Sequence, residues 1–400
     1  MKLLFVHGGE KLKEDNKGNY YTDGSYTQQV WDRYSELSND ITVMFRKEEK
    51  IYDENEAKEK FQFFNKNKYK FKQLNDFSKS FKNYFSIKLR KEDRYKIENM
   101  VKENDFIIAR IPSEASYKAV KFCNKYNKPY LLEVVGCPFD TLWNHSIKGK
   151  ILSIKEYFKM KSIVKKSCYT TYVSEQFLQK RYPTKGNQLA CSDVTINECD
   201  KKNLVERLEK VKKFDKKQKI VIGTVAAVNV KYKGQQYVLK AISRLNKQGY
   251  NMEYMLVGGG DSTYLKKIAE KYDVSDRVKF LGPLKNKQVI DFMKNIDIYI
   301  QPSNAESHGR VIIEAFSTAC PCIGSSTGGI PELISKEYIF KRKNSKDLEN
   351  KIEKMLNDNL SEIAKNNFKK SQEFKLDVLN QKRYDFYEKI LKEVKNEKNI

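Results

Sequence analysis

Two glutamates with seven residues between them stand where a strand, a polar loop and a helix are expected to follow one another. Glu306 lies before the predicted helix that begins at Arg310, and Glu314 lies one turn inside that helix. Both carboxylates can therefore face one crevice over the ends of the strands. Each can accept two hydrogen bonds from adjacent hydroxyls, which suits a ligand rich in hydroxyl groups. Taken alone, a glutamate pair at this spacing is more often an ordinary loop residue followed by a surface helix residue, because such pairs are common.

The loop before this helix has the chemistry of an anion site. Ser307, His308 and Gly309 precede Arg310, and the first amides of a helix have no partner within it. Such amides can hold phosphate or sugar oxygens. The charge of Arg310 is unfavourable at this end of the helix dipole, and a bound anion would resolve that conflict. For His308, packing of the loop is favoured over a catalytic role.

The elements that must position this loop follow from the pattern of apolar runs. Short runs rich in β-branched and aromatic residues alternate with helical or polar stretches, which predicts parallel α/β sheets. The strands are expected at residues 2–6, 41–45, 106–110, 130–136, 169–174 and 188–194, and then at 219–227, 252–258, 278–282, 297–301, 321–325 and 338–340. Two doubly wound, Rossmann-like sheets follow from this arrangement.

Four hundred residues are long for one hydrophobic core, so two domains are expected. A lysine-rich helical pattern at residues 200–219 is the place where a boundary is most easily set. We expect an N-terminal domain at residues 1–205 and a C-terminal domain at residues 206–373. An amphipathic helix at about residues 374–400 is expected to pack back on the first domain.

The composition limits the classes of partner and compartment. Subtracting 52 acidic from 77 basic residues leaves a net charge of +25, enough to attract nucleic acid, anionic lipid or a phosphorylated substrate. The seven cysteines form no C-x-x-C pair, which argues against a disulfide framework and a structural zinc site. No apolar run reaches the roughly 20 residues of a membrane span or the core of a signal peptide. A cytoplasmic protein, at most peripheral on a membrane, is expected.

Two segments of the first half concentrate positive charge. Residues 61–102 contain twelve Lys or Arg against four Asp or Glu, interleaved with aromatic residues. Residues 145–186 contain ten against two. The second segment carries an apolar stripe at helical spacing, namely Ile147, Ile151, Ile154, Tyr157 and Phe158. Basic amphipathic helices suit an anionic bilayer surface, although packing of the stripe on a sheet beneath solvated lysines explains the pattern equally well.

The motif around the glutamate pair resembles a known family. Residues 306–332, with E-S-H-G-x4-E-A followed by G-G-I-P-E, closely resemble the retaining glycosyltransferases of family 4, which have the GT-B fold. Further similarity to the strand and turn segments of this family occurs at residues 222–245, 254–260 and 280–283, and more weakly at residues 23–26, 129–140 and 172–183. The resemblance therefore covers most of the chain and is most specific in the second half.

The resemblance implies that the N-terminal domain at residues 1–205 binds the acceptor and that the C-terminal domain at residues 206–373 binds the nucleotide-sugar. It also implies roles for individual residues. Glu314 would bind the ribose hydroxyls of the donor nucleotide, whereas Glu306 and the amides of Ser307, His308 and Gly309 would hold the transferred sugar. Replacement of either glutamate by alanine is expected to cause a large loss of turnover with the fold intact.

This chain differs from many family members at one of the positions that bind the phosphates. Lys233 would neutralise the donor diphosphate, but many family members carry an arginine six residues earlier, where this chain has Ala227. Arg310, Lys231 or a nest of amides would then take over part of the charge. No D-x-D occurs in the chain. We therefore expect no metal and no cofactor.

Further positions are carried over from the matching segments. Asp140 lies where family members place a polar residue that orients the attacking hydroxyl of the acceptor, although a turn or helix-capping aspartate is an alternative. Gly24, Gly258 and Gly282 lie in the segments that match the donor pocket and are expected to contact the substrate.

Membership of this family would imply an enzyme that moves a hexose or N-acetylhexosamine from a nucleotide-sugar, foremost a UDP-sugar, to a glycan, lipid-linked or polymer acceptor. Retention of the anomeric configuration and a role in cell-surface polysaccharide or glycolipid assembly would go with it. The alternatives are a basic nucleic-acid-binding protein and a GT-B-fold sugar-nucleotide epimerase or phosphorylase. No nucleic-acid-binding module is recognisable, and the epimerase lacks this glutamate pattern, so nucleic acid is not an expected partner.

Overall fold

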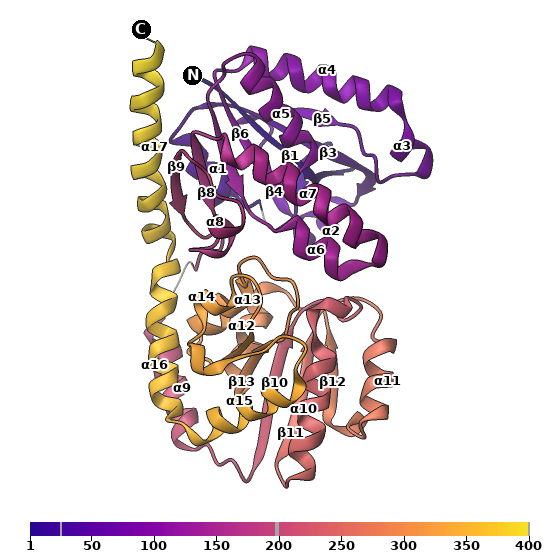
Figure 1. Cartoon of the computed structure of the whole chain (residues 1–400), viewed down its shortest axis with the longest axis vertical. Helices are drawn as coiled ribbons and strands as arrows, with labels where there is room; N and C mark the ends of the chain where they lie inside the picture. Colours follow the sequence, from indigo (N-terminus) through magenta and orange to yellow (C-terminus); the bar gives the residue numbers. More distant parts are fainter. Residues whose placement is uncertain (25, 197–199, 399–400) are drawn as a thin grey trace.

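The computed structural model describes residues 1–24, 26–196 and 200–398. Two sheets, one from each half of the chain, lie one above the other along the long axis of the molecule, with helices around them (Figure 1). The strands are β1 (Lys2–Asp15), β2 (Tyr20–Thr22), β3 (Asp40–Tyr52), β4 (Gln62–Phe64), β5 (Tyr69–Leu74), β6 (Phe106–Ile111), β7 (Tyr130–Val134), β8 (Tyr169–Tyr172), β9 (Asn187–Ala190), β10 (Lys219–Val225), β11 (Asn251–Val257), β12 (Val278–Gly282), β13 (Ile298–Gln301), β14 (Cys322–Ser325) and β15 (Ile339–Phe340).

Helices occupy most of the connections. The helices of the first half are α1 (Gln28–Ser35), α2 (Glu54–Lys60), α3 (Phe81–Phe85), α4 (Ile87–Glu103), α5 (Glu114–Lys125), α6 (Pro138–His145), α7 (Ile147–Lys165) and α8 (Phe177–Arg181). The later helices are α9 (Lys201–Lys212), α10 (Gln235–Lys247), α11 (Thr263–Lys271), α12 (Asn286–Asn295), α13 (Arg310–Ser317), α14 (Ile330–Leu333), α15 (Ser345–Asn357), α16 (Leu360–Ser371) and α17 (Leu376–Lys398). Short 3₁₀ turns lie at Lys231–Lys233, Ser275–Arg277, Lys336–Tyr338 and Gln372–Phe374.

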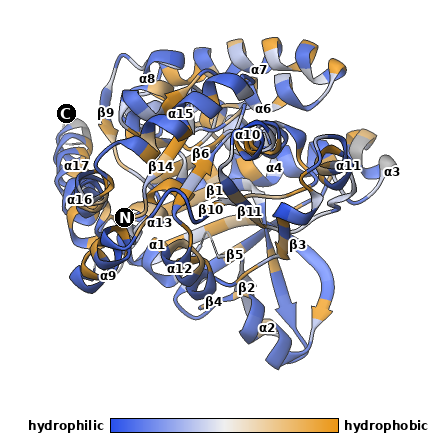
Figure 2. Ribbon diagram, turned by 90° about the horizontal axis from the view of Figure 1, so that it is seen from below, coloured by the Kyte–Doolittle hydropathy of each residue, from blue (hydrophilic) through white to orange (hydrophobic). Residues whose placement is uncertain are grey.

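Both sheets have the doubly wound organisation that the sequence predicts. In the second sheet all neighbouring strands are parallel, in the order β12-β11-β10-β13-β14-β15. In the first sheet β5, β3, β1, β6, β7, β8 and β9 are parallel in this order. The apolar strand β6 is buried along its whole length, and Figure 2 shows it in the apolar colour. The carboxyl ends of both sheets carry the loops of the candidate site.

The first sheet has an extension that the sequence pattern does not predict. The second half of β1 continues beyond the core and pairs in antiparallel fashion with β2, which pairs in turn with β4. Phe64 and Tyr69 are 0% and 1% exposed and surround Trp31. Phe64 and Tyr69, two aromatics of the basic segment at residues 61–102, therefore belong to the core, whereas Phe63 is 53% exposed, because strand alternation turns every second side chain inward.

The last helices connect the two halves. Along the left edge of Figure 1, α16 packs beside α9 and α17 continues past the first sheet. Phe386, Tyr387, Ile390 and Val394 of α17 are buried against residues of β1 and β3. The side chain of Arg207 in α9 donates to the carbonyls of Met293 and Ile296, both at 2.7 Å. The predicted boundary at residue 205 falls within α9 and stays a prediction.

The turn that precedes α10 requires glycine, and this gives a stability prediction. Gly234 has φ +83°, and an added Cβ would overlap the carbonyl oxygen of Pro302. Gly249 has φ +96° but open space around it. Both alanine variants bear the left-handed strain of about 1–2 kcal/mol, whereas Gly234→Ala adds a backbone clash. We expect Gly249→Ala to lower the midpoint of urea unfolding slightly and Gly234→Ala to lower it severely. Equal midpoints would contradict the clash.

Candidate active site between the two sheets

The glutamate loop connects β13 to α13 and is held in place by glycines. Gly309 has φ +83° and forms the N-cap of α13, so no side chain caps the first turn. The amide of Gly329 donates to the carbonyl oxygen of Glu306 at 3.3 Å. A Cβ at Gly328 would overlap the same oxygen. The G-G turn therefore fits against the backbone of the loop, which explains why the two glycine motifs occur together.

The carboxylate of Glu306 lies beside a cation and an amide. Its Oε2 is 3.1 Å from Nζ of Lys233 and 3.4 Å from Nε2 of Gln301. The side chains of Glu306 and Lys233 are 20% and 25% exposed, so solvent reaches both. The structure thus places together two residues that are 73 positions apart and that the sequence assigned to the sugar and the phosphates.

A cavity of about 280 Å³ lies between the two halves of the molecule at this loop. Glu306, Ser307 and Lys233 line it from the second half, and Cys137 and Asp140 line it from the first. The amide of Cys137 donates to Oγ of Ser307 at 2.9 Å, which joins the two walls directly. The candidate residues from both halves therefore share one space.

Asp140 lies in the first turn of α6 and is 8% exposed. Its Oδ1 is 3.4 Å from the guanidinium of Arg181, and its carboxylate is at the wall opposite Glu306. The N-cap of α6 is Cys137 and no side chain caps this helix, so Asp140 is a carboxylate of the first turn and not the capping residue. A carboxylate that lies across the cavity from the loop of Glu306 can accept a hydrogen bond from the hydroxyl of a ligand bound between them.

A second cavity, of about 170 Å³, contains the other glutamate. Gly24, Arg310 and Glu314 line it, and Arg310 lines the first cavity as well. Burial raises the pKa of Glu314, and Arg310 opposes that shift. Among the described residues, the carboxylate of Glu314 has no hydrogen-bond partner, so its acceptor capacity is available to a ligand.

His308 holds the two halves together. Its Nε2 lies 2.7 Å from Oγ of Ser192, and its ring packs at 6.2 Å from that of Phe374. Burial lowers the pKa of His308, and the carboxylates of Asp193 and Glu306 oppose the shift. These contacts are those of a packing residue, although the ring also reaches the wall of the first cavity.

Two predicted glycines lie apart from both cavities. Gly258 and Gly282 end β11 and β12 side by side, and the amide of Gly258 donates to the carbonyl of Gly282 at 2.9 Å. Neither belongs to the lining of the cavity at Glu306 or of that at Glu314. Their contact with a nucleotide stays a prediction.

The structure narrows the choice of side chain that could supply the positive charge of the arginine that this chain lacks at Ala227. Nζ of Lys231 lies over the ring of Tyr264, 4.6 Å from its centroid, and is engaged there. Arg310 lines both cavities. Of the side chains considered, Arg310 is therefore the one placed near both glutamates.

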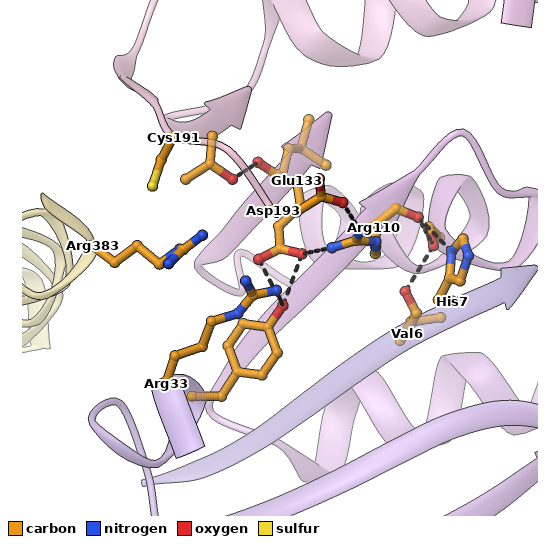
Figure 3. Close-up of polar contacts among 12 residues, drawn as sticks. Val6, His7, Arg33, Arg110, Glu133, Cys191, Asp193 and Arg383 are labelled. Atoms are coloured by element: carbon orange, nitrogen blue, oxygen red, sulfur yellow. Dashed lines mark hydrogen bonds and ion pairs between the residues drawn. The ribbon is translucent and has the colours of Figure 1, made fainter. Parts of the chain in front are cut away.

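A buried network of charges in the walls of the two cavities was not predicted. Figure 3 shows Arg110 of β6 between two carboxylates. Its guanidinium lies 3.1 Å from Glu133 of β7 and 2.7 Å from Asp193. Burial opposes ionisation of Asp193, but Arg110, Arg310 and His308 outweigh it and lower its pKa to about 2. A signal exists in the sequence, because Arg110 and Glu133 interrupt two otherwise apolar strands, FIIARI and YLLEV.

Glu332, the last residue of G-G-I-P-E, also has a structural role across the halves. Its carboxylate accepts from the amides of Glu175 at 2.7 Å, Gln176 at 3.2 Å and Phe177. These amides are at the start of α8, where a carboxylate is favoured. Glu332 therefore helps to set the distance between the walls of the cavity.

Some site types are not found in the part of the chain that the structure describes. Across residues 1–24, 26–196 and 200–398, no three His, Cys, Asp or Glu side chains cluster as metal ligands. Within the same residues, no helix is both long and apolar enough to cross a bilayer. The six described cysteines are all free thiols.

The comparisons with known proteins agree with this arrangement. Residues 205–373 match the family model described as Glycosyl transferases group 1. Protein CapJ of Staphylococcus aureus is 34% identical over 350 residues, which are 86% of this chain and 83% of that protein. The gpi3 subunit of phosphatidylinositol N-acetylglucosaminyltransferase of Schizosaccharomyces pombe is 31% identical over 135 residues, 33% of this chain and 30% of that protein.

Solved structures share the fold over nearly the whole chain. HepE of Anabaena in complex with UDP superimposes with a TM-score of 0.64 at 15% identity, covering 97% of this chain and 100% of that one. WaaG, described as a glycosyltransferase involved in lipopolysaccharide biosynthesis, superimposes with a TM-score of 0.55 at 13% identity, covering 97% and 99%. At these identities the likeness concerns the fold.

Proposed function

Because this chain belongs to the group 1 glycosyltransferases and has the GT-B fold, we propose that it transfers a hexose or N-acetylhexosamine from a UDP-sugar to a glycan, lipid-linked or polymer acceptor. The observation that carries this proposal is the cavity in which Glu306 and Lys233 of one half face Asp140 of the other. In this cavity, between the two sheets, two carboxylates that can accept hydrogen bonds from hydroxyls lie near an ammonium group that can bind phosphate. The UDP complexes of HepE support the choice of nucleotide.

In the proposed reaction, each residue acts on a different part of the substrates. Glu306 accepts hydrogen bonds from the hydroxyls of the transferred sugar, and Glu314 accepts those of the ribose. Lys233 and Arg310 stabilise negative charge as the bond between the anomeric carbon and the diphosphate breaks. The acceptor hydroxyl, oriented by Asp140, attacks from the same face and gives its proton to the departing phosphate. The anomeric configuration is then retained.

A donor-hydrolysis screen tests the proposal. We expect release of the nucleoside diphosphate from at least one UDP-sugar when UDP-, GDP- and ADP-sugars are offered in turn, at a rate that Asp140→Asn lowers once an acceptor is supplied. Titration with single-stranded RNA tests the alternative that the chain is a nucleic-acid-binding protein. Binding of RNA without turnover of any nucleotide-sugar would contradict the proposed function.

Transfer is proposed to proceed without a divalent ion. Lys233 and Arg310 both line the cavity at Glu306 and would balance the charge of the leaving diphosphate, and the chain lacks the D-x-D clamp. We expect dialysis against EDTA to leave the rate of sugar transfer unchanged. Loss of activity that Mg²⁺ restores would show that a metal balances the charge instead.

We propose further that the first half contacts an anionic membrane through α7. Large apolar side chains on this helix are exposed: Ile147 by 81%, Ile151 by 73%, Leu152 by 52%, Ile154 by 49% and Phe158 by 63%. Its buried side consists instead of Gly149, Ser153, Met160 and Val164. The helix also has six lysines against one glutamate. Exposed apolar side chains among lysines match the headgroup region of an anionic bilayer.

Flotation with liposomes checks this contact. We expect the protein to float with vesicles rich in anionic lipid at low salt, and the double variant Ile151→Asp/Phe158→Asp to remain at the bottom of the gradient. Val205→Asp, which alters an apolar side chain 59% exposed on α9, is the matched control and should float normally. Flotation of the double variant together with the wild type would exclude α7 as the docking helix.

A further inference from the structure

Two arginines at the second cavity are buried without a carboxylate beside them. Arg33 of α1 and Arg383 of α17 are 5% and 4% exposed. Within the described parts of the chain, neither guanidinium has a carboxylate oxygen within 4.0 Å. Arg33 donates to the hydroxyl of Tyr34 at 3.0 Å, and its Nε has no partner. Arg383 donates to Oδ1 of Asn380 at 3.2 Å and to the carbonyl of Ser192.

The carboxylates nearby are already engaged. Both Glu133 and Asp193 form ion pairs with Arg110, and Glu133 also accepts from the hydroxyl of Tyr34 at 2.8 and 2.9 Å. Figure 3 shows Arg33 and Arg383 approaching this group from two different helices. Three guanidinium groups therefore share two carboxylates. Among the residues that the structure describes, one positive charge therefore remains without a counter-charge.

Such an arrangement is costly unless a ligand completes it. Buried arginines are normally paired, because an unpaired charge loses its hydration without recovering it in contacts. Arg33 and Arg383 line the cavity of about 170 Å³ that also contains Arg310, Glu314 and Asp193. Counted over the described residues and including Arg110 and Glu133, the site holds four guanidinium groups and three carboxylates. The surplus is positive and faces an open space.

We propose that Arg33 and Arg383 bind an anionic oxygen group, a carboxylate or a phosphate, that a substrate brings into the second cavity. The guanidinium fork matches both groups, since each offers two oxygens to parallel N–H donors. The inference rests on the proposed function, because the substrate is a nucleotide-sugar or its acceptor. Arg33 and Arg383 belong to the first half and to the last helix, so they would bind the ligand from the side opposite Glu314.

Calorimetric titration of Arg33→Gln and Arg383→Gln tests the site. The probes are UDP, UDP-glucose, UDP-glucuronate, and glucose 1-phosphate added to the UDP-saturated protein. We expect each variant to bind the probe that carries the recognised group about 10- to 100-fold more weakly, as for loss of a hydrogen bond to a charged group. Arg94→Gln removes the same charge from an exposed position on α4 and should bind every probe like the wild type.

The pattern of losses identifies the source of the anion. Weaker binding of UDP itself would assign the diphosphate, and loss only for UDP-glucuronate would assign a carboxylate on the donor sugar. Loss only for glucose 1-phosphate would assign a charged acceptor. Wild-type affinity for all four probes in both variants would overturn the inference.

Two further measurements separate binding of an anion from a structural role of Arg33 and from the proposed function. Arg33→Lys keeps the charge and should retain more affinity than Arg33→Gln, which a purely structural role of the side chain would not require. Titration with inorganic pyrophosphate separates this inference from the proposed function. Pyrophosphate binding that Arg33→Gln weakens, in a protein that binds no nucleotide-sugar, would support the anion site and contradict the donor. If the wild type and Arg33→Gln bind pyrophosphate equally, and all four probes bind normally, the nucleotide-sugar donor is supported and the anion site is contradicted.

Discussion

Glu306→Ala is expected to lower kcat for sugar transfer by about 10²- to 10³-fold, the effect typical of removing one group that stabilises a transition state. The carboxylate is the acceptor closest to the cation Lys233, at 3.1 Å, and faces the space where the sugar would lie. The fold should persist, because Glu306 is in a loop and its side chain is partly exposed. Steady-state kinetics with the donor found in the screen measure the loss.

Two companions make this result specific. Glu388→Ala removes a carboxylate that is 71% exposed on α17, and its kcat should equal that of the wild type. Glu306→Gln keeps the shape and one acceptor oxygen, so its kcat should lie between those of the wild type and the alanine variant. A Glu306→Ala enzyme with normal kcat and normal unfolding would remove Glu306 from the reaction.

Lys233→Ala is expected to reduce kcat by about 10²-fold and to raise the KM for the donor, because its ammonium would neutralise the leaving diphosphate. Lys233→Arg should recover part of the rate, since it restores the charge with a different geometry. Lys213→Ala, which removes an exposed lysine next to α9, should leave both constants unchanged. The kinetic constants of all three variants are measured with the same donor.

The contact between the two residues adds a quantitative test. If Lys233 and Glu306 act through one another, the loss in the double alanine variant will be smaller than the product of the two single losses. Strict multiplication would indicate that each residue binds its own part of the substrate independently.

Local patterns in the sequence determined the architecture and the centre of the site. Alternating apolar runs predicted both doubly wound sheets, and all twelve expected strands overlap observed ones. The helix predicted to begin at Arg310 does begin there. These features follow from short-range causes, namely burial of apolar residues at fixed periods and the preference of glycine for turns, so they can be inferred from neighbouring residues.

The tertiary structure alone decided which distant residues meet. The sequence did not reveal that Ser307 contacts Cys137 or that Glu332 caps α8. Nor did it reveal that Arg33 and Arg383 line one cavity without an ion-pair partner among the described residues. It also left open whether the stripe on α7 is buried, and the fold exposes all of it except Tyr157, which packs against the core of the first half. Such contacts join residues more than 100 positions apart through the packing of whole elements. Burial and charge balance at such sites are properties of the assembled layers, which the local pattern of a single chain does not contain.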